Sequence, residues 1–228
     1  IRDRSSTSVV GNSNVEHFAG GQFLRERETG DLSQLRVRNG FRNQDGLGRL
    51  VRIRYDSRDF NGFTFSTSAG AEAIFDTVRQ PSADVAVRYR RIAPDYQFSS
   101  AAALAVIGGD KLQFSGSASI LWSNGFNLTG ALTNRFLPNR NAYALYGKVG
   151  YVTNFFSIGR TAFSADAYVG GNQNVAGARG TAWGLQAVQY HDAWNTDFYL
   201  GYRAYRYSEP DTGYLPSHGV LSGMRVRF

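Results

Sequence analysis

The sequence contains no cysteine, only five prolines and a single methionine. The absence of cysteine excludes disulfide bridges and thiolate metal sites. No apolar run approaches the roughly 18–20 residues that a membrane-spanning helix needs, which excludes a helical membrane protein. Lysine is also scarce, since Lys111 and Lys148 are the only two, and nearly all of the positive charge behind the formal net charge of +7 is arginine.

A basic composition can indicate a nucleic-acid-binding protein, but such proteins usually gather lysine and arginine into runs. Here the arginines are spread singly along segments in which polar and apolar residues alternate. We therefore expect no nucleic-acid partner. Aromatic residues make up 14% of the chain and 26 residues are glycine, a composition that favours strands and tight turns over helices.

From residue 48 onward, apolar residues recur at every second position, which is the period of a half-buried β-strand. In the first such segment, for example, Ile53 lies between Arg52 and Arg54. Eleven strands are predicted, at 49–55, 62–70, 84–90, 96–107, 111–122, 126–135, 142–152, 156–169, 181–190, 196–205 and 217–228. Most are about as long as the 9–11 residues that a tilted transmembrane β-strand needs, and longer than the average globular strand of about 5–6 residues.

The predicted connections differ at the two ends of the strands. Long loops near 72–83, 170–180 and 207–216 fall on one end with a medium loop at 136–141, whereas tight turns fall on the other; 108–110 is the exception. Aromatic residues flank both ends. Short turns opposite long loops, with aromatic girdles at both interfaces, are typical of outer-membrane barrels. The sequence therefore predicts an all-β fold, a transmembrane antiparallel β-barrel with lipid outside and water inside.

The strand count divides the chain into two parts. Barrels of this class have even strand numbers, and an open sheet edge cannot face lipid. Eleven strands therefore leave at least one strand missing or contained in residues 1–47. That stretch is polar and rich in glycine and asparagine, so we expect a long loop at 1–47 and a single barrel domain at 48–228.

Several segments point to a family. The stretch "SVVGNSNVEHFAGGQF" (8–23) is similar to a constriction loop, and "RYDSRDFNGFTFSTSAG" (54–70) to the strand–turn–strand that follows one. "WGLQAVQYHDAWNTDFYLGYRAY" (183–205) and "LSGMRVRF" (221–228) are similar to the last three strands of the same family. In this order the chain resembles the general diffusion porins of Gram-negative outer membranes, which have 16 strands with the constriction loop after the fifth. The resemblance implies a porin sequence without its signal peptide and first five strands.

The resemblance also implies a function. It implies a trimeric passive channel for small hydrophilic solutes and ions in the bacterial outer membrane, surrounded by the lipid bilayer and lipopolysaccharide, with no cofactor and no enzymatic activity. Phe228 would be the signal read by the barrel assembly machinery. The family's eyelet sets acidic loop residues against arginines. By position, the loop candidates are Glu16, Glu26, Glu28 and Asp31, and the wall candidates are Arg52 and Arg54.

Strand alternation predicts further pore-lining residues. These inward candidates are Arg88, Arg90, Arg160, Arg203 and Arg225, with Arg135, Arg227 and Lys148 beside them. Such an excess of positive charge predicts mild anion preference, strongest at low ionic strength and controlled by Arg52 and Arg54. The alternative for any single arginine is a wall charge that pairs with Asp84, Asp166 or Asp197.

Other readings of the sequence remain open. His17, His191 and His218 show no metal-ligand spacing, so no metal is expected, while Asn43 and Asp45 could hold calcium or form a plain turn. A barrel enzyme would need a Ser or Asp paired with His at one height, but Asp197 and His218 are expected near opposite strand ends. A structural or adhesive barrel without conductance is the third possibility. Small outward residues would suit packing between barrels in a trimer, namely Ser100, Ala102, Gly116 and Gly130.

Overall fold

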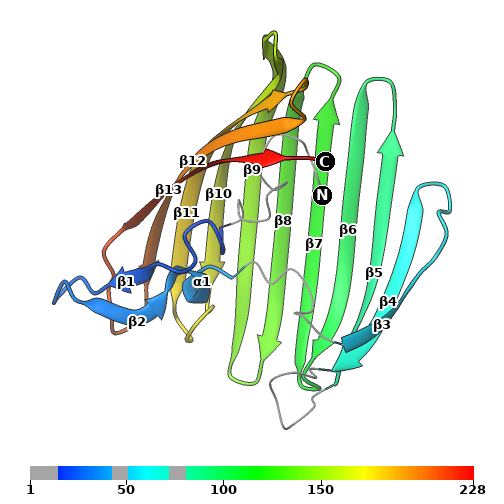
Figure 1. Cartoon of the computed structure of the whole chain (residues 1–228). Coiled ribbons are helices and arrows are strands. Elements are labelled where there is room, and N and C mark those ends of the chain that lie inside the picture. Colours follow the sequence, from blue (N-terminus) through cyan, green and yellow to red (C-terminus); the bar gives the residue numbers. More distant parts are fainter. Residues whose placement is uncertain (1–14, 43–50, 72–80) are drawn as a thin grey trace.

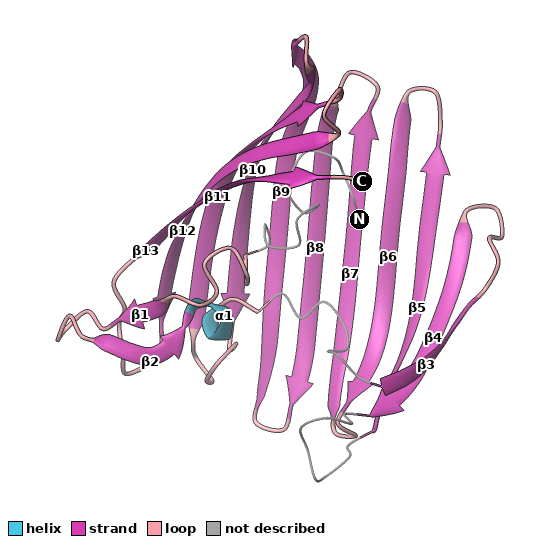
Figure 2. Ribbon diagram, viewed as in Figure 1, coloured by secondary structure: helices cyan, strands magenta, loops and turns pink. Residues whose placement is uncertain are grey.

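The computed structural model describes residues 15–42, 51–71 and 81–228, and within them the chain is dominated by β-strands (Figure 2). Eleven strands form one sheet: β3 (Val51–Asp56), β4 (Phe63–Ala71), β5 (Pro81–Ile92), β6 (Tyr96–Ile107), β7 (Lys111–Trp122), β8 (Phe126–Leu137), β9 (Arg140–Phe156), β10 (Gly159–Gly171), β11 (Arg179–His191), β12 (Thr196–Ser208) and β13 (Ser217–Val226). The predicted all-β fold and its eleven strands are confirmed. No helix in the described ranges is long and apolar enough to cross a membrane.

Each strand of this sheet pairs antiparallel with its neighbour in the sequence, from β3 at one edge to β13 at the other. Two predicted connections are wrong. The turn expected at 153–154 lies inside β9, because pairing with β10 continues past Thr153 and a register shift moves the turn to 157–158. The medium loop expected at 136–141 is a two-residue turn at 138–139, because Leu137 already pairs with Arg140.

The sheet curves like part of a barrel wall, and residues 15–42 lie on its concave side (Figure 1). We call these residues the anchored segment. It contains a two-stranded hairpin, β1 (Phe23–Arg25) and β2 (Leu32–Arg36), and one short helical turn, α1 (Val37–Gly40). The hairpin forms a separate sheet and adds no strand to the large one. The expected boundary between residues 47 and 48 lies outside the described residues.

The two ends of the sheet have different connections. The long-loop rim carries the connections at 108–110, 138–139, 172–178 and 209–216, and the short-turn rim carries those at 57–62, 93–95, 123–125, 157–158 and 192–195. The predicted contrast holds for the two longest described loops, 172–178 and 209–216, and the short connection at 108–110 is the predicted exception. The two-residue turn at 138–139 on the same rim was not predicted. The connection between β4 and β5 is mostly outside the described residues.

One tight turn at the short-turn rim requires glycine. Gly125 ends the turn between β7 and β8 with a φ of 89°. Its carbonyl accepts a 2.9 Å hydrogen bond from the backbone N–H of Val152, and a Cβ added to it would collide with the Val152 carbonyl oxygen. Glycine alone tolerates both the positive φ and this close backbone approach. The residue therefore keeps the β7–β8 turn tight against β9.

The two faces of the sheet have opposite polarity. Large apolar side chains on the convex face are exposed, with Ile53 85% and Val220 72% accessible. The same pattern continues across the sheet through Phe65, Val85, Leu104, Phe114, Leu128, Leu145, Phe163, Leu185 and Leu200. The alternate residues, on the concave face, are mostly polar, charged or small. A sheet of a water-soluble protein would bury its apolar face instead.

Candidate functional site: the concave face and the anchored segment

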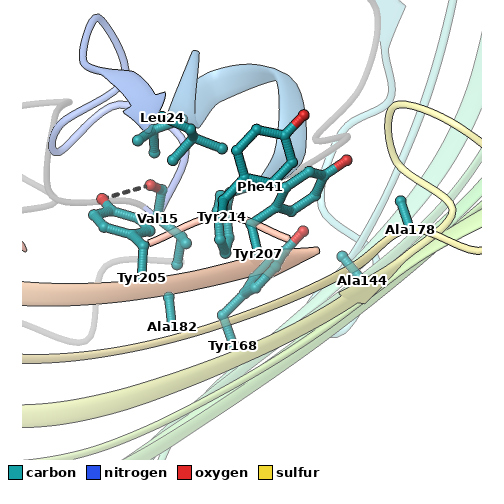
Figure 3. Close-up of a cluster of buried hydrophobic side chains, with 11 residues drawn as sticks. Val15, Leu24, Phe41, Ala144, Tyr168, Ala178, Ala182, Tyr205, Tyr207 and Tyr214 are labelled. Atoms are coloured by element: carbon teal, nitrogen blue, oxygen red, sulfur yellow. Dashed lines mark hydrogen bonds between the residues drawn. The ribbon is translucent and has the colours of Figure 1, made fainter. Parts of the chain in front are cut away.

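Buried side chains hold the anchored segment against β9–β12 (Figure 3). The Tyr205 hydroxyl donates a 2.9 Å hydrogen bond to the backbone carbonyl of Val15, and the Tyr168 hydroxyl donates one of 3.1 Å to that of Arg42. Between these two ends, the Phe41 ring packs 5.0 Å from the Tyr205 ring, centroid to centroid. The segment is thus fixed to the wall near both of its ends.

The Tyr205 contact can be tested directly. We expect Tyr205→Phe to lower the free energy of unfolding by about 1 kcal/mol, because it removes one hydrogen bond and leaves the Val15 carbonyl buried without it. Urea titration of the protein in detergent micelles would measure the change. Tyr55→Phe is the matched control, since Tyr55 is exposed on the convex face and should lose much less. Equal losses in both variants would contradict the anchoring role.

The β1–β2 hairpin follows the loop at 209–216 on the long-loop rim. The backbone N–H of Leu215 donates to the carbonyl of Arg25 at 2.8 Å, and that of Arg27 donates to Gly213 at 2.9 Å. Beside them, burial and the carboxylate of Glu209 raise the pKa of Tyr214. The protonated hydroxyl of Tyr214 is 3.4 Å from Glu209 and donates to it. Backbone hydrogen bonds therefore direct the hairpin along the rim.

The path of the β1–β2 hairpin along the long-loop rim determines where the acidic candidates lie. Glu16 is on the part of the segment that covers the wall, where it interacts electrostatically with Arg135 and Tyr168. The other three, Glu26, Glu28 and Asp31, are on the hairpin at the rim, and Glu26 forms a β-bridge with Tyr214 in the loop. Pairing with the loop therefore places these three candidates at the rim, and their role opposite the arginine wall stays a prediction.

A buried ion pair lies under the anchored segment. The Arg203 guanidinium donates to both oxygens of Asp166, at 2.6 and 2.7 Å, and neither side chain is exposed to solvent. The Phe18 ring covers the pair, with its centroid 5.5 Å from Cζ of Arg203. Arg203 is on the concave face as predicted, but it does not line an open lumen, because Phe18 and the neighbouring strands exclude solvent from it.

A second group of charges lies on β3–β5, at the far edge of the sheet. Arg54 donates to both oxygens of Asp56, at 2.8 and 2.6 Å, and Arg88 is 3.7 Å from the same carboxylate. Arg52 is 3.8 Å from Asp84. The side chains of all five residues are partly exposed, so these pairs are solvated wall charges. Arg52 thus pairs with one of the acids considered from the sequence, Asp84, and its role in a pore stays a prediction.

The remaining candidates lie on other strands of the concave face. Arg225 donates to Asp197 at 2.9 Å, and Arg227 pairs with the same carboxylate. Arg90 is exposed, and Cζ of Arg160 is 5.2 Å from the ring centroid of Tyr190. Arg135 donates to Oε1 of Gln113 at 2.8 and 2.5 Å. The pairing predicted for Asp166 and Asp197 is confirmed, and the wall keeps more positive than negative side chains.

Sequence reasoning missed the side chains that anchor the segment. Tyr205 and Tyr207 follow Gly201 and Arg203 on the polar face of β12, and both are buried against the anchored segment. Large aromatic residues on a face expected to be solvated were a signal that something covers that face. The identity of the covering segment could not be read from this signal, because the contact partners are almost 200 residues apart in the chain.

The structure brings together no enzyme-like pair at the positions considered. Asp197 is on the concave face and pairs with arginines, whereas His218 is on the convex face with its Nδ1 2.6 Å from the Tyr202 hydroxyl. Within the described ranges, no three His, Asp or Glu side chains gather as they would around a metal ion. The calcium candidates Asn43 and Asp45 lie outside those ranges.

No family model and no curated protein matches this sequence. Among solved structures, a rhombohedral crystal form of the NanC porin is similar in fold, with 15% sequence identity and a TM-score of 0.40. The similar region covers 78% of this chain and 92% of the NanC chain.

Proposed function

We propose that this chain forms the wall of a water-filled channel in the bacterial outer membrane, through which small hydrophilic solutes and ions diffuse passively. The opposite polarity of the two faces carries the proposal. An apolar face exposed over eleven strands, backed by a charged face, suits lipid on one side and water on the other. In water, the same convex surface would be an aggregation hazard far larger than the apolar patches of ordinary monomers.

Strand length supports a position in the bilayer. The strands β5–β12 have 12 to 17 residues, enough to cross the hydrocarbon layer when tilted, for which about 9–11 residues suffice. Aromatic side chains stand near both rims of the convex face, with Trp183 toward the long-loop rim and Phe126 and Tyr151 toward the short-turn rim. Such rings are favoured at the two membrane–water interfaces.

The positive excess of the concave wall gives the proposed channel its selectivity. Arg90 and Arg160 have no acidic partner among the described residues, and the acids on β3–β5 and β10–β13 are already paired. Permeating anions would therefore be favoured mildly, and added salt would screen the effect. The proposal involves no catalytic step, no cofactor and no nucleic acid.

The proposed partners follow from the convex face. Ser100, Ala102, Gly116 and Gly130 lie together there on β6–β8, because the strand register sets them on the same face. This patch of small side chains supports close packing between copies in a homotrimer. The lipid bilayer and lipopolysaccharide would cover the rest of the face. Recognition of Phe228 by the barrel assembly machinery stays a prediction.

Recording currents across planar bilayers tests the function. We expect the purified protein to insert in discrete steps of constant conductance, because a solvated wall passes ions without gating chemistry. Heat-denatured protein is the control.

A second candidate, a structural barrel without conductance, is favoured by the anchored segment, which covers β9–β12 and seals Arg203 from solvent. Folded protein that inserts without current steps would overturn the channel in favour of that candidate, and turnover of a membrane substrate would instead indicate a barrel enzyme.

A further inference from the structure

Two arginines stand out on the apolar convex face. Along the described strands this face carries no acidic residue and only three arginines, Arg91, Arg179 and Arg206. Arg91 lies toward the short-turn rim, whereas Arg179 and Arg206 lie together at the long-loop rim. Both of these are exposed, and neither side chain makes a hydrogen bond or ion pair with another described residue. A charge on a lipid-facing surface is costly at the middle of the bilayer but is tolerated at the rim, where it can meet the counter-charge of a headgroup.

The strand register places the two rim arginines side by side. Arg179 pairs with Ser208 and Thr181 pairs with Arg206, so the two arginines are diagonal neighbours on β11 and β12. Diagonal neighbours of this kind are about 7–8 Å apart at the backbone, within reach of long side chains. The nearby acid Glu209 is already engaged, since it accepts hydrogen bonds from Asn174 and Tyr207. The two guanidinium groups therefore repel each other, and no carboxylate on the described strands of the convex face neutralises their charge.

Below the arginines, the surface changes in layers toward the middle of the sheet. The first layer is amphipathic, with the Trp183 and Tyr202 rings 5.3 Å apart and Tyr202 hydrogen-bonded to His218. The next is an open apolar groove of about 650 Å³ that starts at Tyr202, and its lining includes Leu185, Leu200, Val220, Phe163 and Val149. Charge, amphipathic ring and hydrocarbon follow in the order in which a lipid presents its headgroup, interface and acyl chains.

We propose that this surface binds a lipid whose headgroup carries a phosphate monoester, with the phosphate on Arg179 and Arg206 and an acyl chain in the groove. The inference rests on the proposed function in one respect, that the convex face lies in the bilayer. Guanidinium groups bind phosphate oxygens in a bidentate fork. A phosphate monoester carries close to two negative charges near neutral pH, which matches two unpaired arginines better than the single charge of a phosphodiester.

Trp183 offers a local readout. The other two tryptophans, Trp122 and Trp194, lie toward the short-turn rim, so a Trp122→Phe/Trp194→Phe variant leaves Trp183 as the sole tryptophan beside the site. This protein would be placed in phosphatidylcholine vesicles that contain one test lipid with brominated chains. The test lipid is phosphatidic acid, phosphatidylglycerol or phosphatidylcholine, and its bromine atoms quench the fluorescence of a nearby tryptophan. We expect phosphatidic acid to be preferred over phosphatidylcholine at Trp183 by at least about five-fold, and phosphatidylglycerol by less.

Variants identify the residues. Arg179→Gln/Arg206→Gln should abolish the preference, whereas Arg91→Gln, the same change on the same face at the other rim, should leave it unchanged. Ala187→Phe, which fills the groove without changing charge, should weaken binding of both lipids. Equal quenching by all three lipids, or a preference that survives the double substitution, overturns the proposal. Competition by unlabelled lipid A would show that a phosphorylated glycolipid is also accepted, and its absence would confine the site to glycerolipids.

Conductance of the same preparations keeps the two proposals apart. Lipid preference at Trp183 with no current steps would overturn the channel and support the lipid site. Current steps without any lipid preference would overturn the lipid site and support the channel. The Arg179→Gln/Arg206→Gln variant is expected to keep the wild-type conductance, since both side chains are on the convex face, away from the proposed lumen.

Discussion

Replacing Asp166 with alanine is expected to lower the free energy of unfolding by about 3–5 kcal/mol, because it leaves the Arg203 guanidinium buried without its counter-charge. Neither side chain of this pair has any exposed surface, and Phe18 covers the pair from the concave side. Water therefore cannot replace the lost carboxylate unless the anchored segment lifts away. Urea-induced unfolding in detergent micelles, followed by tryptophan fluorescence, would measure the loss.

Two further variants show whether burial is the cause. Asp84→Ala removes the partner of Arg52, but both side chains of that pair are partly exposed, so we expect a loss of less than about 1 kcal/mol. The double substitution Asp166→Leu/Arg203→Met replaces the buried pair with apolar side chains and should regain most of the stability. A loss in Asp166→Ala no larger than that in Asp84→Ala would contradict this account.

Charge selectivity is expected to depend on Glu16, on the anchored segment, and on Arg135, on β8, because these two charges interact electrostatically. A unit charge contributes about 0.8 kcal/mol at about 5 Å in water. The Debye length at 0.1 M salt is about 10 Å, so screening over about 5 Å reduces this interaction energy to about 0.5 kcal/mol. An energy of this size changes the local concentration of each ion by about two-fold. Glu16→Gln should therefore shift the reversal potential in a KCl gradient toward chloride, and Arg135→Gln should shift it toward potassium.

Matched substitutions test the location of this control. Glu28→Gln removes the same charge from the hairpin at the long-loop rim and should leave the reversal potential nearly unchanged. Arg52→Gln/Arg54→Gln removes charge from β3 at the sheet edge, where sequence reasoning placed the controlling wall. If the β3 variant shifts the reversal potential more than Arg135→Gln does, the arginines of β3 control the selectivity and this account is wrong. Repeating the recordings near 1 M salt should reduce every shift.

The sequence alone determined the strands and their faces. The period of two around Ile53 assigns each side chain to one face, since successive residues of a strand point to opposite sides. Each strand pairs with the next along the chain, so the order of the sheet also follows from short connections that the sequence displays. The two wrong turns arose where local signals were weak, because the polar pair at 153–154 resembles a turn although the hydrogen-bonded ladder continues beyond it.

Only the tertiary structure determined whether the candidate site residues are buried or exposed and where they lie. Alternation places Arg203 on the polar face, but whether that face meets water depends on Phe18, which lies on a segment far away in the sequence. Likewise, the hairpin with Glu28 goes to the rim because its backbone pairs with the loop at 209–216. Strand period is a local property of neighbouring residues, whereas burial and pairing between remote segments depend on how the whole sheet curves, and no local pattern encodes that curvature.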